Sequence, residues 1–223
     1  MQHFALGYQN NKSFRSFKIL KCWNRVFHIE GFEIYDLSSD SWRVLDDLAL
    51  NCWILDSGVS LKGNAYWLAL GETGFFLLGF DFTRDIFVRF CLPQLEDRST
   101  INLSVVRDEK LSLLHCPRYA SHVEVWVTHE IDTQAALWSK SFIVKLHSLP
   151  YHYLISLRIE SFLIDEENKV ALCSYPGSGD SKKLFICGED NEYYRQIPCA
   201  GTTNPVIFSY VPSLFRVQQS GSK

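Results

Sequence analysis

The chain has 223 residues, of which 47% are hydrophobic and 21% charged, and its formal net charge is −3. This composition fits one soluble globular domain and excludes a disordered chain, and the weak negative charge leaves no electrostatic footprint for nucleic acid. No apolar run approaches the roughly 18 residues needed to cross a bilayer, so we expect neither a nucleic-acid nor a membrane partner.

Short alternating runs, and not helical periodicity, dominate the chain, and aromatic residues, which favour strands, make up 14% of it. NAYWLAL at 64–70 and FFLLGF at 75–80 are strand-like runs separated by the turn-prone GETG. Small polar turns at 62–64, 108–110 and 167–169 each lie between two apolar runs. This pattern predicts β-hairpins, because such residues accept the unusual backbone angles of tight turns.

One eight-residue pattern occurs twice, as YDLSSDSW at 35–42 and FDFTRDIF at 80–87, about 45 residues apart. We predict that each copy is the third strand, the turn and the fourth strand of a four-stranded unit. Asp36 and Asp81 would end the third strands, where a short carboxylate can accept hydrogen bonds from nearby backbone N–H groups.

The aromatic residues that close the two copies, Trp42 and Phe87, are expected on outer strands, packed between neighbouring units. Four-stranded antiparallel units at this interval are typical of propeller blades. A β-sandwich or a barrel would also contain many short strands, but a sandwich has no reason to repeat at equal intervals.

The predicted fold is therefore all-β and β-propeller-like, with about four antiparallel four-stranded blades in a single domain, residues 1–223. Such a ring is either small or incomplete, and an incomplete ring leaves an open edge that attracts other strands. We expect a capped end, a partner or poor solubility in that case. The blade-like units lie near 3–46, 58–93, 101–146 and 158–199, with a closing strand at 206–217.

The chain resembles the F-box associated (interaction) domain of plants, type 1, over nearly its whole length. The resemblance implies a β-propeller-like module that captures a protein for ubiquitination by a cullin-based, SCF-type ligase. The matching stretches, in chain order, are FALGYQNNKSFRSFKIL, FEIYDLSSDSWRVLD, GNAYWLA, LLGFDFTRDIF, LSVVRDEKLSLLH, VEVWVTHEI, LWSKSFIVKL, SFLIDEENKVAL and YVPSLFRV.

The helical F-box that docks such proteins onto the ligase adaptor has no counterpart in this sequence. The resemblance therefore implies the substrate-capturing part only, and we expect a fragment or an isolated domain. The adaptor would be a partner only if an F-box is supplied upstream. The remaining partner is a protein target, whose identity the sequence does not give.

The cysteines predict a reducing compartment, the cytoplasm or the nucleus, since their number is odd and no CxxC motif occurs. The N-terminal residues 1–14 also lack the basic and apolar regions of a secretory signal. We expect the thiols to be small apolar core groups. They are Cys22, Cys52, Cys91, Cys116, Cys173, Cys187 and Cys199.

The candidates for metal ligands are His115, Cys116, His122 and His129, because Cys and His are the usual zinc ligands. His115 and Cys116 are neighbours on a predicted strand, so their side chains should point to opposite faces. The spacing also lacks the paired ligands of known zinc sites. We predict no metal and no cofactor.

Catalytic motifs are absent from the sequence: there is no GxSxG elbow, and GSGD at 177–180 lacks the phosphate-binding pattern. The acidic runs at 165–167 and at Asp46 and Asp47 are interpreted as solvated turns. We predict no catalytic residue and no enzyme. The alternative that stays open is a propeller-fold enzyme such as a glycoside hydrolase, which needs two carboxyl groups about 5–10 Å apart.

Tryptophans are the candidates for partner binding, because Trp often anchors protein interfaces. Trp67 and Trp126 lie within strand-like runs and are expected to fill space between blades. Trp23 and Trp53 lie in connecting segments and are the partner-binding candidates. Loops that the domain could offer to a target lie at 23–31, 116–122 and 176–182.

Overall fold

All regular structure among the described residues is β-strand, and this part of the chain contains no helix that could span a membrane. The structure, a computed structural model, describes residues 2–10, 15–25, 28–45, 50–55, 57–95, 100–117, 120, 122–132, 134–145, 159, 161–176, 182–189, 195–198 and 207. Three predicted features lie outside these residues: GSGD at 177–180, the acidic pair Asp46 and Asp47, and the closing strand at 206–217 except for Ile207.

Four antiparallel sheets form from these strands, which confirms the all-β, propeller-like class. They are distributed over two compact units, one centred on Met1–Leu92 and the other on Pro93–Asp132 with Ala136–Tyr210. Sheets A and B belong to the first unit, and sheets C and D to the second.

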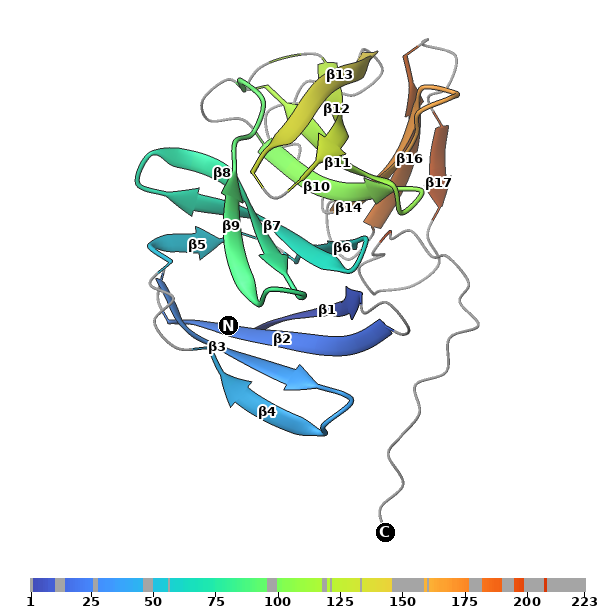
Figure 1. Cartoon of the computed structure of the whole chain (residues 1–223). Helices are drawn as coiled ribbons and strands as arrows, with labels where there is room; N and C mark the ends of the chain where they lie inside the picture. Colours follow the sequence, from blue (N-terminus) through green and yellow to red (C-terminus); the bar gives the residue numbers. More distant parts are fainter. Residues whose placement is uncertain are drawn as a thin grey trace. The chain divides into compact units, whose positions relative to one another are not determined.

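Unit 1 contains sheet A, a meander in the order β1-β2-β3-β4, and sheet B, in the order β5-β7-β8-β9 with β6 paired to β7 (Figure 1). The strands of sheet A are β1 (Gln2–Asn10), β2 (Arg15–Arg25), β3 (His28–Asp36) and β4 (Ser41–Val44). Those of sheet B are β5 (Cys52–Ile54), β6 (Val59–Leu61), β7 (Asn64–Gly71), β8 (Gly74–Asp81) and β9 (Ile86–Phe90).

Unit 2 contains two more meanders, sheet C in the order β10-β11-β12-β13 and sheet D in the order β14-β15-β16-β17. The strands of sheet C are β10 (Thr100–Val106), β11 (Lys110–Cys116), β12 (His122–Ile131) and β13 (Ala136–Lys145). Those of sheet D are β14 (Ser161–Asp165), β15 (Val170–Pro176), β16 (Lys182–Gly188) and β17 (Arg195–Pro198).

The predicted repeat coincides with equivalent elements of sheets A and B. The first copy forms the end of β3, its turn and the start of β4, and the second copy forms the same parts of β8 and β9. The prediction of third strand, turn and fourth strand is confirmed.

The core of unit 1 lies between sheets A and B and follows the period-2 alternation of the strands. Leu20 and Cys22 of β2 face this core, as do Phe32 and Ile34 of β3, while the residues between them point to the opposite face. Trp67 of β7 is 1% exposed within the same cluster, so the prediction that it fills space between blades is confirmed.

Phe87 of β9 is partly buried and packs against this core. Its ring centroid lies 4.5 Å from that of Phe32 in sheet A and 4.7 Å from that of Phe80 in sheet B. The expectation that Phe87 packs between blades is thus confirmed. Trp42, at the equivalent place in the repeat, is 50% exposed, and its ring packs on Tyr35 of its own sheet; that expectation was wrong.

The core of unit 2 lies between sheets C and D and has the same construction. Its central residues include Val123 and Val125 of β12, Phe142 of β13, Phe162 of β14 and Phe185 of β16. Trp126 lies on the other face of β12, where its indole N–H donates to Glu124. Trp126 therefore takes no part in the core that sheets C and D share, and the expectation that it packs between blades stays a prediction.

The cysteines are mostly core residues, as predicted. Burial raises the pKa of Cys22 to about 12 and that of Cys116 to about 11, so both are neutral thiols at physiological pH. The buried thiols within the described part of the chain are Cys22, Cys52, Cys116, Cys173 and Cys187, whereas Cys91 is exposed.

Candidate protein-binding surfaces

Each sheet has one end that carries the turns from its first to its second and from its third to its fourth strand, which we call the turn end. In sheet B these are the β6–β7 and β8–β9 turns. The non-glycine residues with a left-handed backbone among those described all lie at turn ends: Asp40, Lys62, Asp85, Arg107, Asp108 and Lys169. A left-handed backbone costs energy in residues other than glycine, so these turns have fixed shapes.

Three of the loops share one construction, in which an aspartate ends a strand and bonds the backbone of the turn. The carboxylate accepts from the backbone N–H two residues further along, at 2.8 Å for Asp36 and Asp81 and at 3.1 Å for Asp165. This confirms the predicted role of Asp36 and Asp81, and the sequence reasoning missed that Asp165 repeats it. The fourth residue after each aspartate has a positive φ, namely Asp40 (50°), Asp85 (54°) and Lys169 (52°).

Hydrogen bonding sets the charge state of these carboxylates. Burial by itself would raise the pKa of Asp81, but hydrogen bonds from the Arg84 side chain and from the backbone of Arg84 and Thr83 outweigh it and lower the pKa. The pKa of Asp165 is lowered chiefly by the hydrogen bond from the Asn168 side chain. Both carboxylates are therefore ionised at neutral pH and keep their turns closed.

The β10–β11 turn is the most strained of these turns. Arg107 and Asp108 both have positive φ, 51° and 54°, and Glu109 N–H donates to the carbonyl of Val106 at 2.9 Å. In the corresponding β6–β7 turn the second left-handed place is taken by Gly63, with φ of 88°. Two consecutive non-glycine residues in this conformation are uncommon, and backbone strain of this kind clusters at functional sites.

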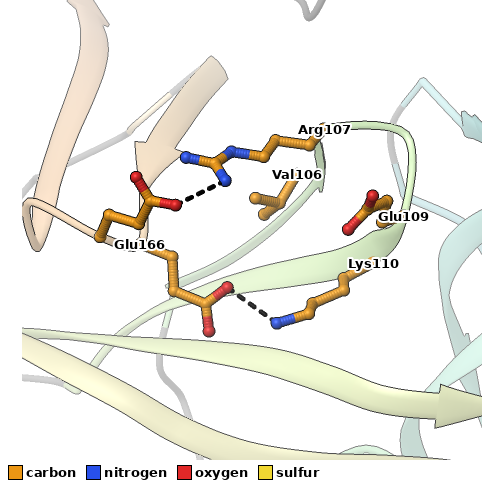
Figure 2. A pocket seen from close by; sticks show the side chains of 6 residues that line it. Val106, Arg107, Glu109, Lys110 and Glu166 are labelled. Atoms are coloured by element: carbon orange, nitrogen blue, oxygen red, sulfur yellow. Dashed lines mark hydrogen bonds and ion pairs between the residues drawn. The ribbon is translucent and has the colours of Figure 1, made fainter.

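A charged pocket of about 220 Å³ lies between this turn and the β14–β15 turn of sheet D. Figure 2 shows Arg107 and Lys110 extending from one hairpin toward two glutamates of the other. Arg107 lies 2.8 Å from Glu167 and Lys110 lies 2.9 Å from Glu166. The pocket is lined by Val106, Arg107, Glu109, Lys110, Glu166 and Glu167.

The pocket's ion pairs fix its shape more than they stabilise the fold. The hydrogen bond from Arg107 lowers the pKa of Glu167, and Glu167 in turn raises that of Arg107. Exposed pairs of this type contribute little to the free energy of unfolding. They do align charged groups at a surface, which is what specific recognition of another protein requires.

A second charged cluster surrounds Glu124 of β12. Its carboxylate accepts hydrogen bonds from His115 at 2.9 Å, Trp126 at 3.2 Å and Lys140 at 2.5 Å. Burial would raise the pKa of Glu124, but these hydrogen bonds lower it to about 2. The sequence reasoning missed this cluster, although a lone Glu opposite the apolar face of VEVWV was a signal for it.

The candidate metal ligands are not brought together as a ligand set. His115 binds Glu124 on one face of sheet C, whereas Cys116 faces the core between sheets C and D, as the strand alternation predicted. His122 lies 3.9 Å from Glu124. No group of three or more potential metal ligands occurs within the residues that the structure describes.

The outer face of sheet A, opposite its core, is an exposed apolar surface. The side chains that strand pairing places on it include Phe4, Leu6, Ile19, Lys21, Trp23, Glu33, Tyr35, Trp42 and Val44. Phe4, Leu6, Trp42 and Val44 are between 50% and 58% exposed. Contiguous exposed apolar patches mark interaction surfaces when they are large.

Trp23, one of the two tryptophans predicted to bind a partner, belongs to this face. The Lys21 ammonium lies 5.5 Å from the ring centroid of Trp23 and 5.7 Å from that of Trp42. A Cβ atom at Gly31 would be 2.4 Å from the Trp23 ring, so the ring lies directly over that glycine. Its role in binding stays a prediction.

The other predicted residues are not brought together with Trp23. Trp53 is 37% exposed on β5, at the edge of sheet B. The loops 23–31, 116–122 and 176–182 each include residues outside the described part of the chain, and their binding roles stay predictions.

The comparison with known proteins agrees with this architecture. The family model described as "F-box associated beta propeller domain" matches residues 1–217. A relative named Putative F-box only protein 9, of Arabidopsis thaliana, is 44% identical over 237 residues, covering 99% of this chain and 61% of the relative. F-box/kelch-repeat protein At3g17530, of the same plant, is 37% identical and covers 97% of this chain and 60% of the relative.

The chain thus spans about three fifths of the length of the curated relatives it matches. The match extends across both units, so it does not depend on one motif or one sheet. The chain belongs to the family of F-box associated β-propeller domains.

Proposed function

We propose that the chain captures a target protein for an SCF-type ubiquitin ligase, and that the turn end of unit 2 contacts the target. The observation that carries the second part is the pocket between the β10–β11 and β14–β15 turns, where two ion pairs place opposite charges side by side. The first part rests on membership of the family.

Strain supports the choice of this surface. The β10–β11 turn keeps both Arg107 and Asp108 in a left-handed conformation, and at the place of Asp108 sheet B has Gly63. Since a glycine there would cost less, the Asp108 side chain is retained at some expense in stability. A requirement for the shape of this turn in binding explains that expense.

The mechanism is positioning, and the chain itself makes and breaks no covalent bond. A captured target would be held at a rigid surface while the ligase transfers ubiquitin to it. The adaptor would bind an F-box supplied by the rest of a longer protein, as the names of the relatives suggest. We expect this to take place inside the cell, in the cytoplasm or the nucleus.

A glycoside hydrolase is not favoured. In the charged pocket Glu166 and Glu167 each form an ion pair with a cation from the neighbouring hairpin. A general acid needs the opposite, a carboxyl group whose pKa is raised, whereas the pKa of Glu167 is lowered.

The test joins the full chain to the F-box segment of a relative and reconstitutes ubiquitination of a protein that the chain retains from plant extract. Lys110→Glu should reduce ubiquitination of that protein at least tenfold, because it places like charges beside Glu166 and costs binding free energy. Lys62→Glu is the matched control, with the same change of charge in the β6–β7 turn of unit 1. Equal ubiquitination with all three chains would contradict the proposed surface.

A further inference from the structure

The outer face of sheet A has no partner in the chain as described, although the inner face of the same sheet packs on sheet B. Leu20 and Phe32 on the inner face are each 1% exposed. Phe4 and Val44 on the outer face are 58% and 57% exposed. Sheet A is thus apolar on both faces, a pattern typical of a sheet that packs on a second sheet on each side.

The side chains on the outer face form rows across the four strands. One row, read from β1 to β4, is Phe4, Lys21, Glu33 and Val44, each directly opposite the next in the strand pairing. The order of properties is apolar, positive, negative, apolar. At its centre the Lys21 ammonium lies 2.8 Å from the Glu33 carboxylate.

The neighbouring row is apolar and aromatic throughout. Leu6, Ile19, Tyr35 and Trp42 are paired in the same way across the sheet. Tyr35 and Trp42 have ring centroids 5.1 Å apart. This row offers continuous apolar contact to anything that lies flat on the sheet.

We propose that the outer face of sheet A binds the same face of a second copy of this chain. The two copies would be related by a two-fold axis that runs parallel to the strands, between β2 and β3. Such an axis reverses the order of each row in the partner. Lys21 of one copy then lies on Glu33 of the other, and Phe4 lies on Val44. In the apolar row, Leu6 meets Trp42 and Ile19 meets Tyr35.

Charge complementarity argues for a second copy over another occupant. The row of apolar, positive, negative and apolar side chains becomes its own complement when it is reversed. A two-fold interface requires this property, because every contact must occur twice with the roles exchanged. The proposal does not depend on target capture, which uses the turn end of the other unit.

The experiment measures the molar mass of the full chain in solution by light scattering or sedimentation over a concentration series. The wild-type chain should form dimers. Lys21→Glu places two carboxylates together at each contact between the copies, and Glu33→Lys places two ammonium groups together, so each single variant should be monomeric. An equimolar mixture of the two variants restores opposite charges at both contacts and should dimerise again.

The mixture distinguishes a lost interface from a lost fold, because misfolded chains would not recover on mixing. Trp42→Ser should also give monomers. Leu137→Ser is the matched control, since Leu137 is 55% exposed on β13 of unit 2, and it should leave the dimer intact.

A chain that stays monomeric at all concentrations would overturn the proposal. The next candidate to cover the outer face of sheet A would then be a further sheet of the longer family members. Dimers that resist Lys21→Glu and Trp42→Ser would overturn it as well. So would single variants that remain monomeric when mixed.

Discussion

The ammonium of Lys18 in sheet A lies 3.0 Å from the carboxylate of Asp85 in the β8–β9 turn of sheet B. Lys18 also donates to the carbonyl of Phe82 at 3.0 Å, and its side chain is only 7% exposed. Arg43 of β4 binds the other oxygen of the same carboxylate. The β8–β9 turn of sheet B is thereby joined to β2 and β4 of sheet A.

Lys18→Met is expected to destabilise the chain by about 3 kcal/mol, because it leaves a buried carbonyl without its donor and a carboxylate with one cation fewer. Urea unfolding of the purified chain measures this. Arg107→Gln, which removes an exposed ion pair, is the control and should leave stability close to that of the wild-type chain. Equal effects of the two substitutions would mean that Lys18 does not join the sheets.

Gly7 allows β1 to approach sheet B. A Cβ atom at this position would be 2.1 Å from the Phe82 ring and 2.5 Å from the carbonyl oxygen of Gly63. Gly7→Ala should therefore cost about 2–3 kcal/mol, since a backbone atom cannot move aside as a side chain can. At Gly71 the nearest atom would be a Phe76 ring carbon at 3.2 Å, and thermal unfolding should show that Gly71→Ala costs less.

Asp108 tests the strain in the charged turn. Asp108→Gly should raise the free energy of unfolding by up to about 1 kcal/mol, because glycine adopts a positive φ without steric cost. Glu109 does not have a positive φ, so Glu109→Gly should lower stability by a similar amount. If both glycines destabilise the chain equally in urea unfolding, the turn is not strained.

Glu124 should make stability depend on pH in the acid range. Its pKa is lowered in the fold from 4.5 to about 2, so its contribution is complete above the unfolded value and disappears as the pH falls toward 2. Glu124→Gln should cost about 2 kcal/mol at pH 6 and progressively less between pH 4.5 and 2. A difference from wild type that stays constant over this range would contradict the described cluster.

Much of the fold could be predicted from the sequence because its signals are local. Alternation along each strand and the aspartate that ends β3 and β8 depend on residues next to one another. Asp36 and Asp81 bond the turns as expected. The different environments of Trp42 and Phe87 could not be predicted from the sequence. Trp42 lies on the exposed face of its sheet and Phe87 on the face that packs against another sheet, and the repeat does not show which face packs.

The candidate surfaces were harder to predict because they join residues far apart in the chain. Arg107 and Glu167 come from hairpins of different sheets, and no spacing within one hairpin indicates that they meet. Trp23 was predicted from its residue type and from an expected place in a connecting segment, whereas it lies on β2. Its contact with Lys21 and its place over Gly31 follow from strand pairing, which fixes the register of β2 on β3.

Hydrogen–deuterium exchange of the chain with and without a captured target protein tests most directly where the target binds. Backbone amides in residues 106–110 and 165–169 should exchange more slowly in the complex, because the target covers the pocket between these two turns. Unchanged exchange in both segments, with protection at another surface of the chain, would contradict this placement of the target.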